Sequence, residues 1–541
     1  MKRLVRILCL LLVVVGGAAA NAAERGFEYK SYTLANGLQV VVFPNHRAPI
    51  VNQTLWYRVG SADEPKGVSG IAHFLEHLMF KGTPTVPPGE FSKIVARNGG
   101  RDNAFTSSDY TGYFQTVPAG ALDMVMRMEA DRMTNLILSD KEVLPERDVI
   151  LEERRSRTDN SPAALLSEAT SEALFGPEGY GIPIIGYERE MRTLSRENAI
   201  EFYKKHYAPN NAILVVAGDV EPEQVRALAE RHFGALKPAS LEPRTRPFRS
   251  QIHGPAVVER RDARVQQIQW SRDYLAPSYK AGETRHAIPL QVLSYVLGGN
   301  QNSRLYRELV VQQKIASQAG SWYSPAALGQ TTFSVAATPA ASATLDTIKQ
   351  AIDREIARIA QQGVTAEELE RAKLQLLAAN TYARDSLTSA ARLYGGQLAI
   401  GRTLEEINDW PAQIEAVTRT AVAFIPARLD RGAAGDRGGA MRARRAATKA
   451  LSSGTALALL ITLLVVLTPA PPTAADGNEA RSNPFVARSI TAGSTHTCVL
   501  VHSARVKCWG RNNHGQLGLG DTADRGDTAG EMGDNLPTVD L

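Results

Sequence analysis

Two histidines and a glutamate lie close together in the segment 67–82. If this segment is helical, His73 and His77 are four residues apart on one face, so both imidazoles can reach a single metal ion. Glu76 lies on nearly the same side, where its carboxylate can take a proton from a water molecule beside the metal. Tetrahedral zinc needs one more protein ligand and keeps one position open. A histidine pair on a helix is usually an ordinary structural feature, but the rarer His-x-x-Glu-His spacing favours a metal site with a water-activating carboxylate.

The ends of this helix can also be predicted from the sequence. Ser69 is a candidate N-cap, because its hydroxyl can accept a hydrogen bond from a free backbone N–H of the first turn. Gly82 is a candidate C-terminal stop. We therefore expect a helix over 69–81.

A second helix, expected over 139–157, offers the missing ligand. Glu146 and Glu153 are seven residues apart, so their carboxylates lie on one face, two turns from each other. Glu152 points about 100° away from that face and is expected to stay in solvent. The alternative is that the whole acidic stretch is a solvated helix face that pairs with the neighbouring arginines.

The combination of these motifs resembles a known family. His-x-x-Glu-His followed by a glutamate 76 residues beyond the last histidine is similar to the inverted-zincin peptidases of the pitrilysin/insulinase family, which includes the mitochondrial processing peptidases. The resemblance extends over about residues 30–425. The matching segments are Leu34-Ala35-Asn36-Gly37-Leu38, Gly70 to Gly82, Gly99-Gly100, Asn103 to Ser107 and Glu146 to Glu153.

The resemblance implies a metal site when it is carried over by position. One Zn²⁺ per chain would be held by His73, His77 and Glu153. Glu76 would be the general base, and Glu146 a further carboxylate of the catalytic site, behind the ligands. All four residues of the metal and base set are present, which favours a working enzyme over a subunit that has lost catalysis.

The resemblance also implies a way of binding substrate. Asn103 and Phe105 would lie on an edge strand against which an extended peptide is laid. The family's second domain usually adds an Arg and a Tyr, seven residues apart, after a Ser-Arg-Leu segment. That segment is present at 303–305, but the two positions are occupied here by Val310 and Ser317, neither of which can replace an arginine guanidinium.

These observations together predict a function. We expect a zinc-dependent metallo-endopeptidase that hydrolyses extended peptides or unfolded polypeptide segments. Because the Arg/Tyr clamp is missing, the chain is expected to be the metal-bearing half of a heterodimer whose homologous partner supplies the clamp. The alternative is a non-catalytic or weakly active binding or assembly subunit, which this fold also hosts.

The order of strand-like and helical segments predicts the fold class. Segment 24–235 mixes strands, beginning with a hairpin at Asn36-Gly37, with helices expected at 89–98, 120–136, 162–175 and 195–206. A similar order restarts in 236–425, with a strand expected at 265–270. We therefore predict an α+β protein with two similar domains that form half of a peptidase chamber. The second domain should be truncated, its sheet short of a strand and left with an open edge.

The first 23 residues resemble a signal peptide. A basic start, an apolar run and a small-residue stretch ending at Ala23 follow one another. The mature protein is therefore expected to be exported to the periplasm. The alternative is an uncleaved segment that anchors the chain to a membrane.

The composition changes after about residue 425. We expect a linker over 426–440, then a basic and apolar segment over 441–475 that resembles a second signal peptide or an anchor. Membrane contact is expected only if the apolar run 455–467 is retained as an anchor. We interpret this junction as two joined reading frames.

The last segment, 476–541, resembles a single repeat of the chromosome-condensation-regulator type of β-propeller. Cys498 and Cys508 are close enough in sequence to pair in an oxidising compartment. Free thiols, or a zinc site with His496 and His514, are the alternatives.

The charge of the chain argues against one class of partner. The 541 residues carry a formal net charge of only +5. Without a lysine-rich tract interleaved with aromatic residues, a nucleic-acid partner is not expected.

Overall fold

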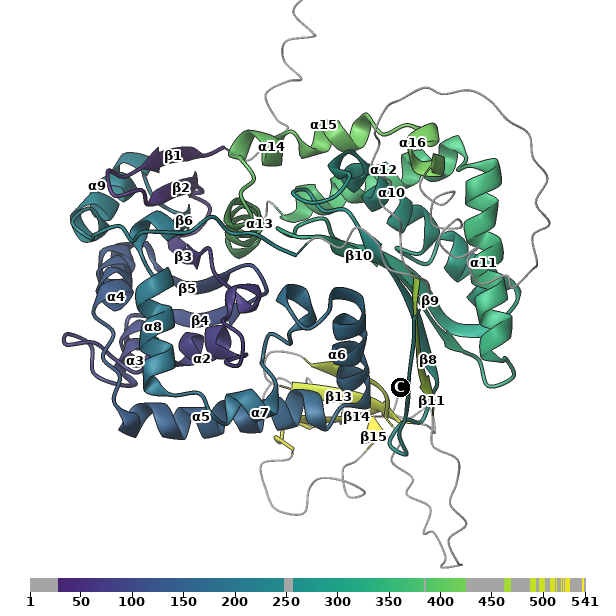
Figure 1. The fold of residues 1–541 in the computed structure, drawn as a ribbon, viewed down its shortest axis with the longest axis horizontal. Helices are drawn as coiled ribbons and strands as arrows, with labels where there is room; N and C mark the ends of the chain where they lie inside the picture. Colours follow the sequence, from purple (N-terminus) through teal and green to yellow (C-terminus); the bar gives the residue numbers. More distant parts are fainter. Residues whose placement is uncertain are drawn as a thin grey trace, which may run out of the picture. The chain divides into compact units, whose positions relative to one another are not determined.

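The computed structural model describes residues 28–247, 256–383, 386–424 and 462–468, together with short pieces between 487 and 539 (Figure 1). The chain divides into two compact units, Met1–Ala470 and Pro471–Leu541. The predicted signal peptide (1–23) and the predicted linker (426–440) lie outside the described residues. Among the described residues, no helix combines the length and apolar character that crossing a bilayer requires.

The first half of the larger unit is built on a six-stranded sheet in the order β1-β2-β6-β3-β5-β4. Its strands are β1 (Lys30–Thr33), β2 (Gln39–Pro44), β3 (Ile50–Tyr57), β4 (Arg101–Thr106), β5 (Thr111–Pro118) and β6 (Ala212–Gly218). β1 and β2 pair antiparallel around Asn36-Gly37, as the sequence predicts. The central strand β6 is apolar and buried along its whole length, as expected for a strand that is covered on both faces.

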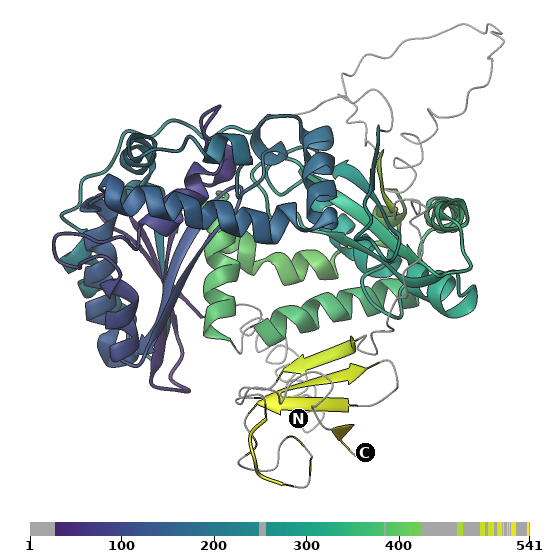
Figure 2. The same ribbon diagram turned by 90° about the horizontal axis from the view of Figure 1, so that it is seen from below.

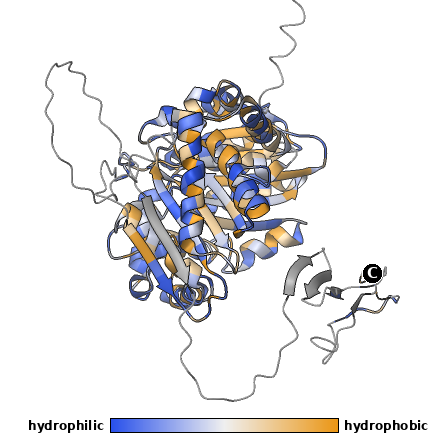
Figure 3. Cartoon of the chain, turned by 90° about the vertical axis from the view of Figure 1, so that its right-hand side faces the viewer, coloured by the Kyte–Doolittle hydropathy of each residue, from blue (hydrophilic) through white to orange (hydrophobic). Residues whose placement is uncertain are grey.

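Helices cover one face of this sheet and form the main core with it (Figure 2). They are α2 (Ile71–Leu78), α3 (Glu90–Arg97), α4 (Leu122–Thr134), α5 (Asp140–Arg154), α7 (Glu188–Met191), α8 (Arg196–His206) and α9 (Pro222–Phe233). The helices expected from the sequence in this half are confirmed, although α2 is shorter at both ends than predicted. Orange and blue residues alternate along the helices in Figure 3, because one side of each faces a core and the other faces water.

The second half is built on a five-stranded sheet in the order β7-β11-β8-β10-β9. Its strands are β7 (Ala256–Arg261), β8 (Gln269–Ala276), β9 (Ala316–Tyr323), β10 (Thr331–Pro339) and β11 (Thr462–Thr468). A second core forms between this sheet and its helices, which include α10 (Ala287–Leu297), α11 (Leu345–Gln362), α12 (Ala366–Ala383) and α16 (Arg419–Phe424). The expected strand at 265–270 is misplaced, since β8 begins at Gln269, and neither β7 nor β9 was predicted.

The two sheets share one topology, which confirms two similar mixed α/β domains. In the first sheet β2 is parallel to β6, and β6 is antiparallel to β3. In the second sheet β7 is parallel to β11, and β11 is antiparallel to β8. In each sheet two further antiparallel strands follow. Among the described residues, the second sheet has one strand fewer than the first, and an internal position of it, between β7 and β8, is occupied by β11.

Each sheet is covered on its other face by a helix from the opposite half. α13 (Leu387–Ala399) packs on β3 and β6 of the first sheet. Gly395 of this helix lies against Trp56 so closely that a Cβ atom would come within 2.1 Å of the indole ring. In turn α6 (Pro162–Phe175) packs against β7 and β11 of the second sheet. The exchange of helices ties the two halves into one unit.

The smaller unit contains an antiparallel sheet in the order β12-β13-β14-β15. Its strands are β12 (Ala487–Ala492), β13 (His496–Val501), β14 (Val506–Gly510) and β15 (Thr538–Val539). Cys508 is disulfide-bonded, and Cys498 lies directly opposite it in the register of β13 and β14. This arrangement favours the disulfide over free thiols or a zinc site.

A buried ionic cluster fastens the segment that follows α9 to the first domain. Arg246 donates to Asp63 at 2.7 Å, and Arg244 donates to the same carboxylate at 3.0 Å. Arg246 also pairs with Asp109 at 2.8 Å. Asp109 accepts a further hydrogen bond from the backbone N–H of Leu328 in the second domain. The cluster therefore connects both domains through their connecting segment.

Replacing Asp63 with Asn should destabilise the protein by about 3 kcal/mol or more, because the guanidinium groups of Arg244 and Arg246 lose the negative charge with which both are paired. Burial raises the pKa of the Asp63 carboxyl, but Arg246 and Arg244 outweigh it and hold that pKa below the usual 3.8. The contribution of Asp63 is thus present above about pH 4 and lost as pH falls through the lowered pKa.

Chemical denaturation of both proteins between pH 7 and pH 2 measures this. Asp123→Asn is the matched control, since its exposed pairing with His232 and Arg231 should contribute no more than about 1 kcal/mol. Equal effects of the two substitutions at pH 7 would contradict the structural role of the cluster.

Candidate metal centre

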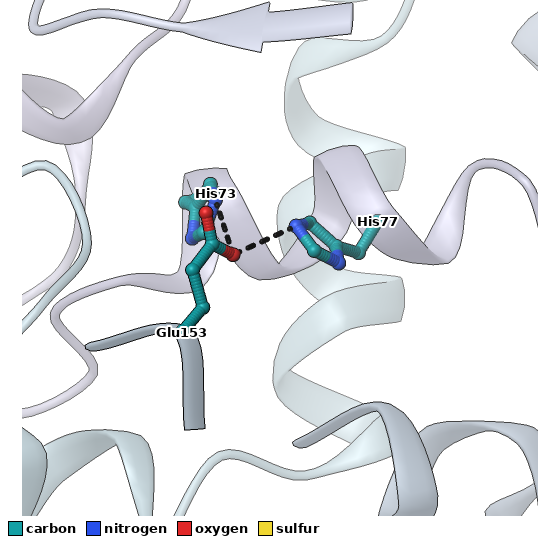
Figure 4. Close-up of side chains that lie close together, drawn as sticks. All are labelled: His73, His77 and Glu153. Carbon is teal, nitrogen blue, oxygen red and sulfur yellow. Dashed lines mark ion pairs between the residues drawn. The ribbon is translucent and has the colours of Figure 1, made fainter. Parts of the chain in front are cut away.

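Three side chains from two helices point at one another on the first domain (Figure 4). His73 and His77 of α2 lie with their ring centroids 4.8 Å apart. Glu153 at the end of α5 places its Oε2 atom 3.6 Å from His73 Nε2 and 3.4 Å from His77 Nε2. The sequence-predicted ligand set is thus brought together, although 76 residues separate His77 from Glu153.

The geometry of these atoms fits a zinc ion. Tetrahedral zinc with bonds of about 2.0–2.1 Å keeps neighbouring ligand atoms about 3.4 Å apart. The two nitrogen–oxygen separations are close to that value. Burial lowers the pKa of His73 to about 3, so its imidazole is neutral and has a lone pair to give. Among the described residues this is the one group of His, Cys, Asp and Glu that converges in this way.

Glu146 lies behind the predicted ligands, in contact with His77. Its Oε1 atom accepts a 2.8 Å hydrogen bond from Nδ1 of His77, which leaves Nε2 of that ring directed at Glu153. Lys81 pairs with the other oxygen of Glu146. Burial raises the pKa of Glu146, but the hydrogen bonds from His77 and Lys81 more than compensate and lower it, so the carboxylate stays charged.

Glu76 lies beside the ligands in a setting suited to a general base. Its side chain is buried, and Thr106 of β4 donates to its Oε2 atom at 2.6 Å. Burial raises the pKa of Glu76, and the hydrogen bond from Thr106 opposes this in part. A raised pKa makes the carboxylate a better proton acceptor near neutral pH. Glu152, in contrast, is exposed and pairs with Arg155, as predicted.

The start of α2 is held differently from the prediction. Its N-cap is Gly70, in the left-handed conformation, and not Ser69. The Ser69 hydroxyl instead accepts a hydrogen bond from the backbone N–H of Tyr187. The free N–H groups of Gly70 and Ala72 donate at 2.9 Å to the buried carboxylate of Glu64, which the sequence interpretation missed.

The N-cap position of α2 cannot carry a capping side chain, because it must be glycine. A Cβ at Gly70 would approach the carbonyl oxygen of Ile185 to 2.6 Å. The close approach of a second loop therefore requires glycine, and the helix N-terminus recruits a carboxylate from further back in the chain. A lone Glu six residues before a glycine gives no sequence signal for this role.

The metal ligands open into a cavity of about 1120 Å³. Its walls come from α2, β4, the end of α5, α6 and the loop 180–185. Strand β4 forms an edge of the described sheet, with β5 as its partner there. Asn103 and Phe105 both line the cavity, while the ring of Phe105 also stacks edge-on against Trp56 at 5.0 Å.

The positions expected for the substrate clamp lie outside this cavity. Val310 packs against the second core, and Ser317 donates to the carbonyl of Thr338. The nearby Arg304 is engaged by Glu368 at 2.7 Å. Among the described residues, no arginine of the second domain lines the metal cavity. The arginine that lines it is Arg157 of the first domain, which pairs with Glu153.

The combination of this fold with this site is that of a known peptidase family. Residues 39–188 match the family model for "Insulinase (Peptidase family M16)", and residues 193–376 match the model for "Peptidase M16 inactive domain". The chain therefore belongs to the pitrilysin/insulinase (M16) family. In the smaller unit, residues 487–516 match the model of the regulator of chromosome condensation (RCC1) repeat.

Particular relatives agree with this assignment. The chain is 37% identical to zinc protease PqqE of Helicobacter pylori over 59% of this chain and 72% of that protein. It is 31% identical to an uncharacterized zinc protease of Mycobacterium leprae over 73% of this chain and 89% of that protein.

Solved structures show the same fold. A protease from Helicobacter pylori superposes with a TM-score of 0.68 at 28% identity, over 81% of this chain and 99% of that one. The first half of the periplasmic protease PqqL from Escherichia coli superposes with a TM-score of 0.64 at 21% identity, over 81% of this chain and 91% of that one. The larger unit thus has the fold of half of such a peptidase.

Glu153→Gln should weaken zinc binding by at least about 100-fold, because losing a direct ligand costs more than losing an outer partner. Competition with a chromophoric chelator measures the change. Glu152→Gln is the matched control, one residue away on the same helix but exposed, and should bind zinc like the unmodified protein. Equal affinities of the two variants would remove Glu153 from the ligand set.

Proposed function

We propose that this protein is a zinc-dependent metallo-endopeptidase that hydrolyses extended peptides or unfolded polypeptide segments. The observation that carries the proposal is the convergence of His73 Nε2, His77 Nε2 and Glu153 Oε2 on one point. One zinc ion per chain would be held there. Buried Glu76 beside the same cavity supplies the base that hydrolysis needs.

Each residue of the site has a separate role in the proposed reaction. Bound zinc would supply a Lewis acid that polarises a water molecule and the scissile carbonyl. Glu76 takes a proton from the attacking water and later passes it to the departing amine nitrogen. Thr106 holds the Glu76 carboxylate by its hydrogen bond, and Glu146 fixes the ring of His77.

Strand β4 supports the proposed selection of extended substrates. A peptide laid along an edge strand makes main-chain hydrogen bonds that do not depend on its sequence, so affinity comes from its extended shape. Asn103 and Phe105 lie on this strand and line the cavity. We assign both to substrate binding, Asn103 through its amide and Phe105 through the part of its ring that is exposed in the cavity.

Export to the periplasm is part of the proposal. It rests on the signal-like residues 1–23, which resemble a cleavable leader. The disulfide of Cys508 supports it, because disulfides persist in oxidising compartments. A fold neighbour, PqqL of Escherichia coli, is itself described as periplasmic.

We further propose that the chain works as the metal-bearing subunit of a heterodimer. The support is chemical, because hydrolysis at the metal gains from a cation and a hydroxyl that hold the substrate. Val310 is apolar and packs against the second core, and the Ser317 hydroxyl donates to the carbonyl of Thr338 outside the metal cavity. A homologous partner would bring its Arg and Tyr to this cavity. The alternative, a weakly active or non-catalytic assembly subunit, is favoured by the same missing clamp.

Glu76→Gln should bind zinc like the unmodified chain and lose about 10²–10⁴-fold in kcat, because the amide keeps the shape but cannot accept a proton. Hydrolysis of a quenched fluorescent peptide, with zinc content measured on the same samples, separates the two properties. If the unmodified protein binds no zinc, the central claim fails. If the Glu76→Gln protein hydrolyses the peptide equally well, Glu76 is not the base.

Adding a homologous subunit that carries Arg and Tyr seven residues apart should raise kcat/KM by about 10²–10³-fold, the typical contribution of a transition-state donor. The same peptide assay, with the chain alone and in the mixture, measures this. A partner variant with Ala in place of both clamp residues is the control and should give no increase. Full activity of the chain alone would rule out the heterodimer.

A further inference from the structure

The second sheet contains a strand that comes from far along the chain. β11 (Thr462–Thr468) lies between β7 and β8, with six residues in register on each side. Among the described residues, β11 is the strand partner through which β7 joins the sheet. Helix α6 packs across both β7 and β11. The segment is thus an internal element of the larger unit, which extends to Ala470.

The first domain has a strand, β6, at the position that corresponds to β11 in the second sheet. There β6 lies between β2 and β3, parallel to the first and antiparallel to the second, as β11 does between β7 and β8. The two strands are also similar in sequence, since Leu214-Val215-Val216 of β6 corresponds to Leu464-Val465-Val466 of β11. β11 therefore occupies the position of β6 in the repeated architecture.

The two domains differ in how the chain reaches this position. In the first domain β6 begins at Ala212, six residues after α8 ends at His206. In the second domain the last helix, α16, ends at Phe424, and the strand begins only at Thr462. The intervening 425–461 carry the change of composition that separates the peptidase part from the tail. Among the described residues, the strand that follows α16 in this domain is β11, which lies beyond this stretch.

The local sequence suits the interior of a sheet. All five residues between Thr462 and Thr468 are apolar, which is typical of a strand covered on both faces and unlike the alternation of a half-exposed strand. Without this strand, β7 would lose its ladder and one side of β8 would lose its hydrogen-bond partners. Unpaired backbone groups in the middle of a sheet are costly, and an open strand edge invites pairing with other chains.

We infer that the second domain has a strand-acceptor site between β7 and β8, and that residues 462–468 of the same chain are its occupant. This gives the apolar run of the tail a role in completing the peptidase fold. While it is paired in this sheet, the segment cannot also span a membrane or act as a signal peptide. The inference is independent of the proposed zinc chemistry, because it concerns the sheet of the second domain, and the proposed metal ligands lie in the first domain.

A proline in the strand tests this in the full-length chain. Val465→Pro removes a backbone N–H and should raise amide hydrogen exchange in β8 (269–276) by about tenfold or more. Ala456→Pro is the matched control, in the same apolar run but before the strand begins, and should leave exchange in β8 unchanged. Equal exchange in both variants and the unmodified protein would overturn the inference.

A second measurement covers the case in which Val465→Pro prevents folding. A synthetic peptide of residues 460–470, extended with lysines for solubility, is added while this variant refolds. If the peptide restores slow exchange in β8, it has filled the site in trans, as the inference expects. If it does not, or if intact-mass analysis of the exported protein finds a chain that ends before residue 462, the segment is not the occupant.

Discussion

A zinc centre on this chain requires donor atoms from α2 and α5 to meet within about 3.4 Å, although 76 residues lie between His77 and Glu153. The packing of α2 against α5 therefore controls the site. Both helices are fixed from outside the ligand set: Glu64 holds the start of α2, and Glu146 joins the two helices through His77. Because ligand geometry tolerates little displacement, these supports matter as much as the ligands.

The two-domain architecture gives the centre its surroundings. The exchange of α6 and α13 between the two halves means that neither sheet has both faces covered by its own domain. The same α6 contributes to the wall of the metal cavity. A disturbance of the second sheet can thus reach the cavity through α6, even though the second domain supplies no ligand. This connects completion of the second sheet by β11 with the function proposed for the first domain.

The structure changes the interpretation of the apolar segment within 441–475. From composition, 441–475 resembles a signal peptide or an anchor, because apolar runs of this length are common to both. A buried strand has the same composition, and length alone does not separate the possibilities. Pairing with β7 and β8 distinguishes them, and pairing between residues about 200 apart has no local signature.

The sequence by itself predicted the ligand set, the base and the supporting Glu146: helical periodicity places residues four and seven apart on one face, and the family resemblance assigns their roles. It also determined the α+β class and most helices of the first domain. Only the tertiary structure decided that Glu64 and not Ser69 caps α2, that Phe105 packs against Trp56, and that residues 462–468 complete the second sheet. The physical reason is common to these cases: contacts within a helix repeat along the chain, whereas contacts between distant segments depend on packing, which leaves no regular spacing in the sequence.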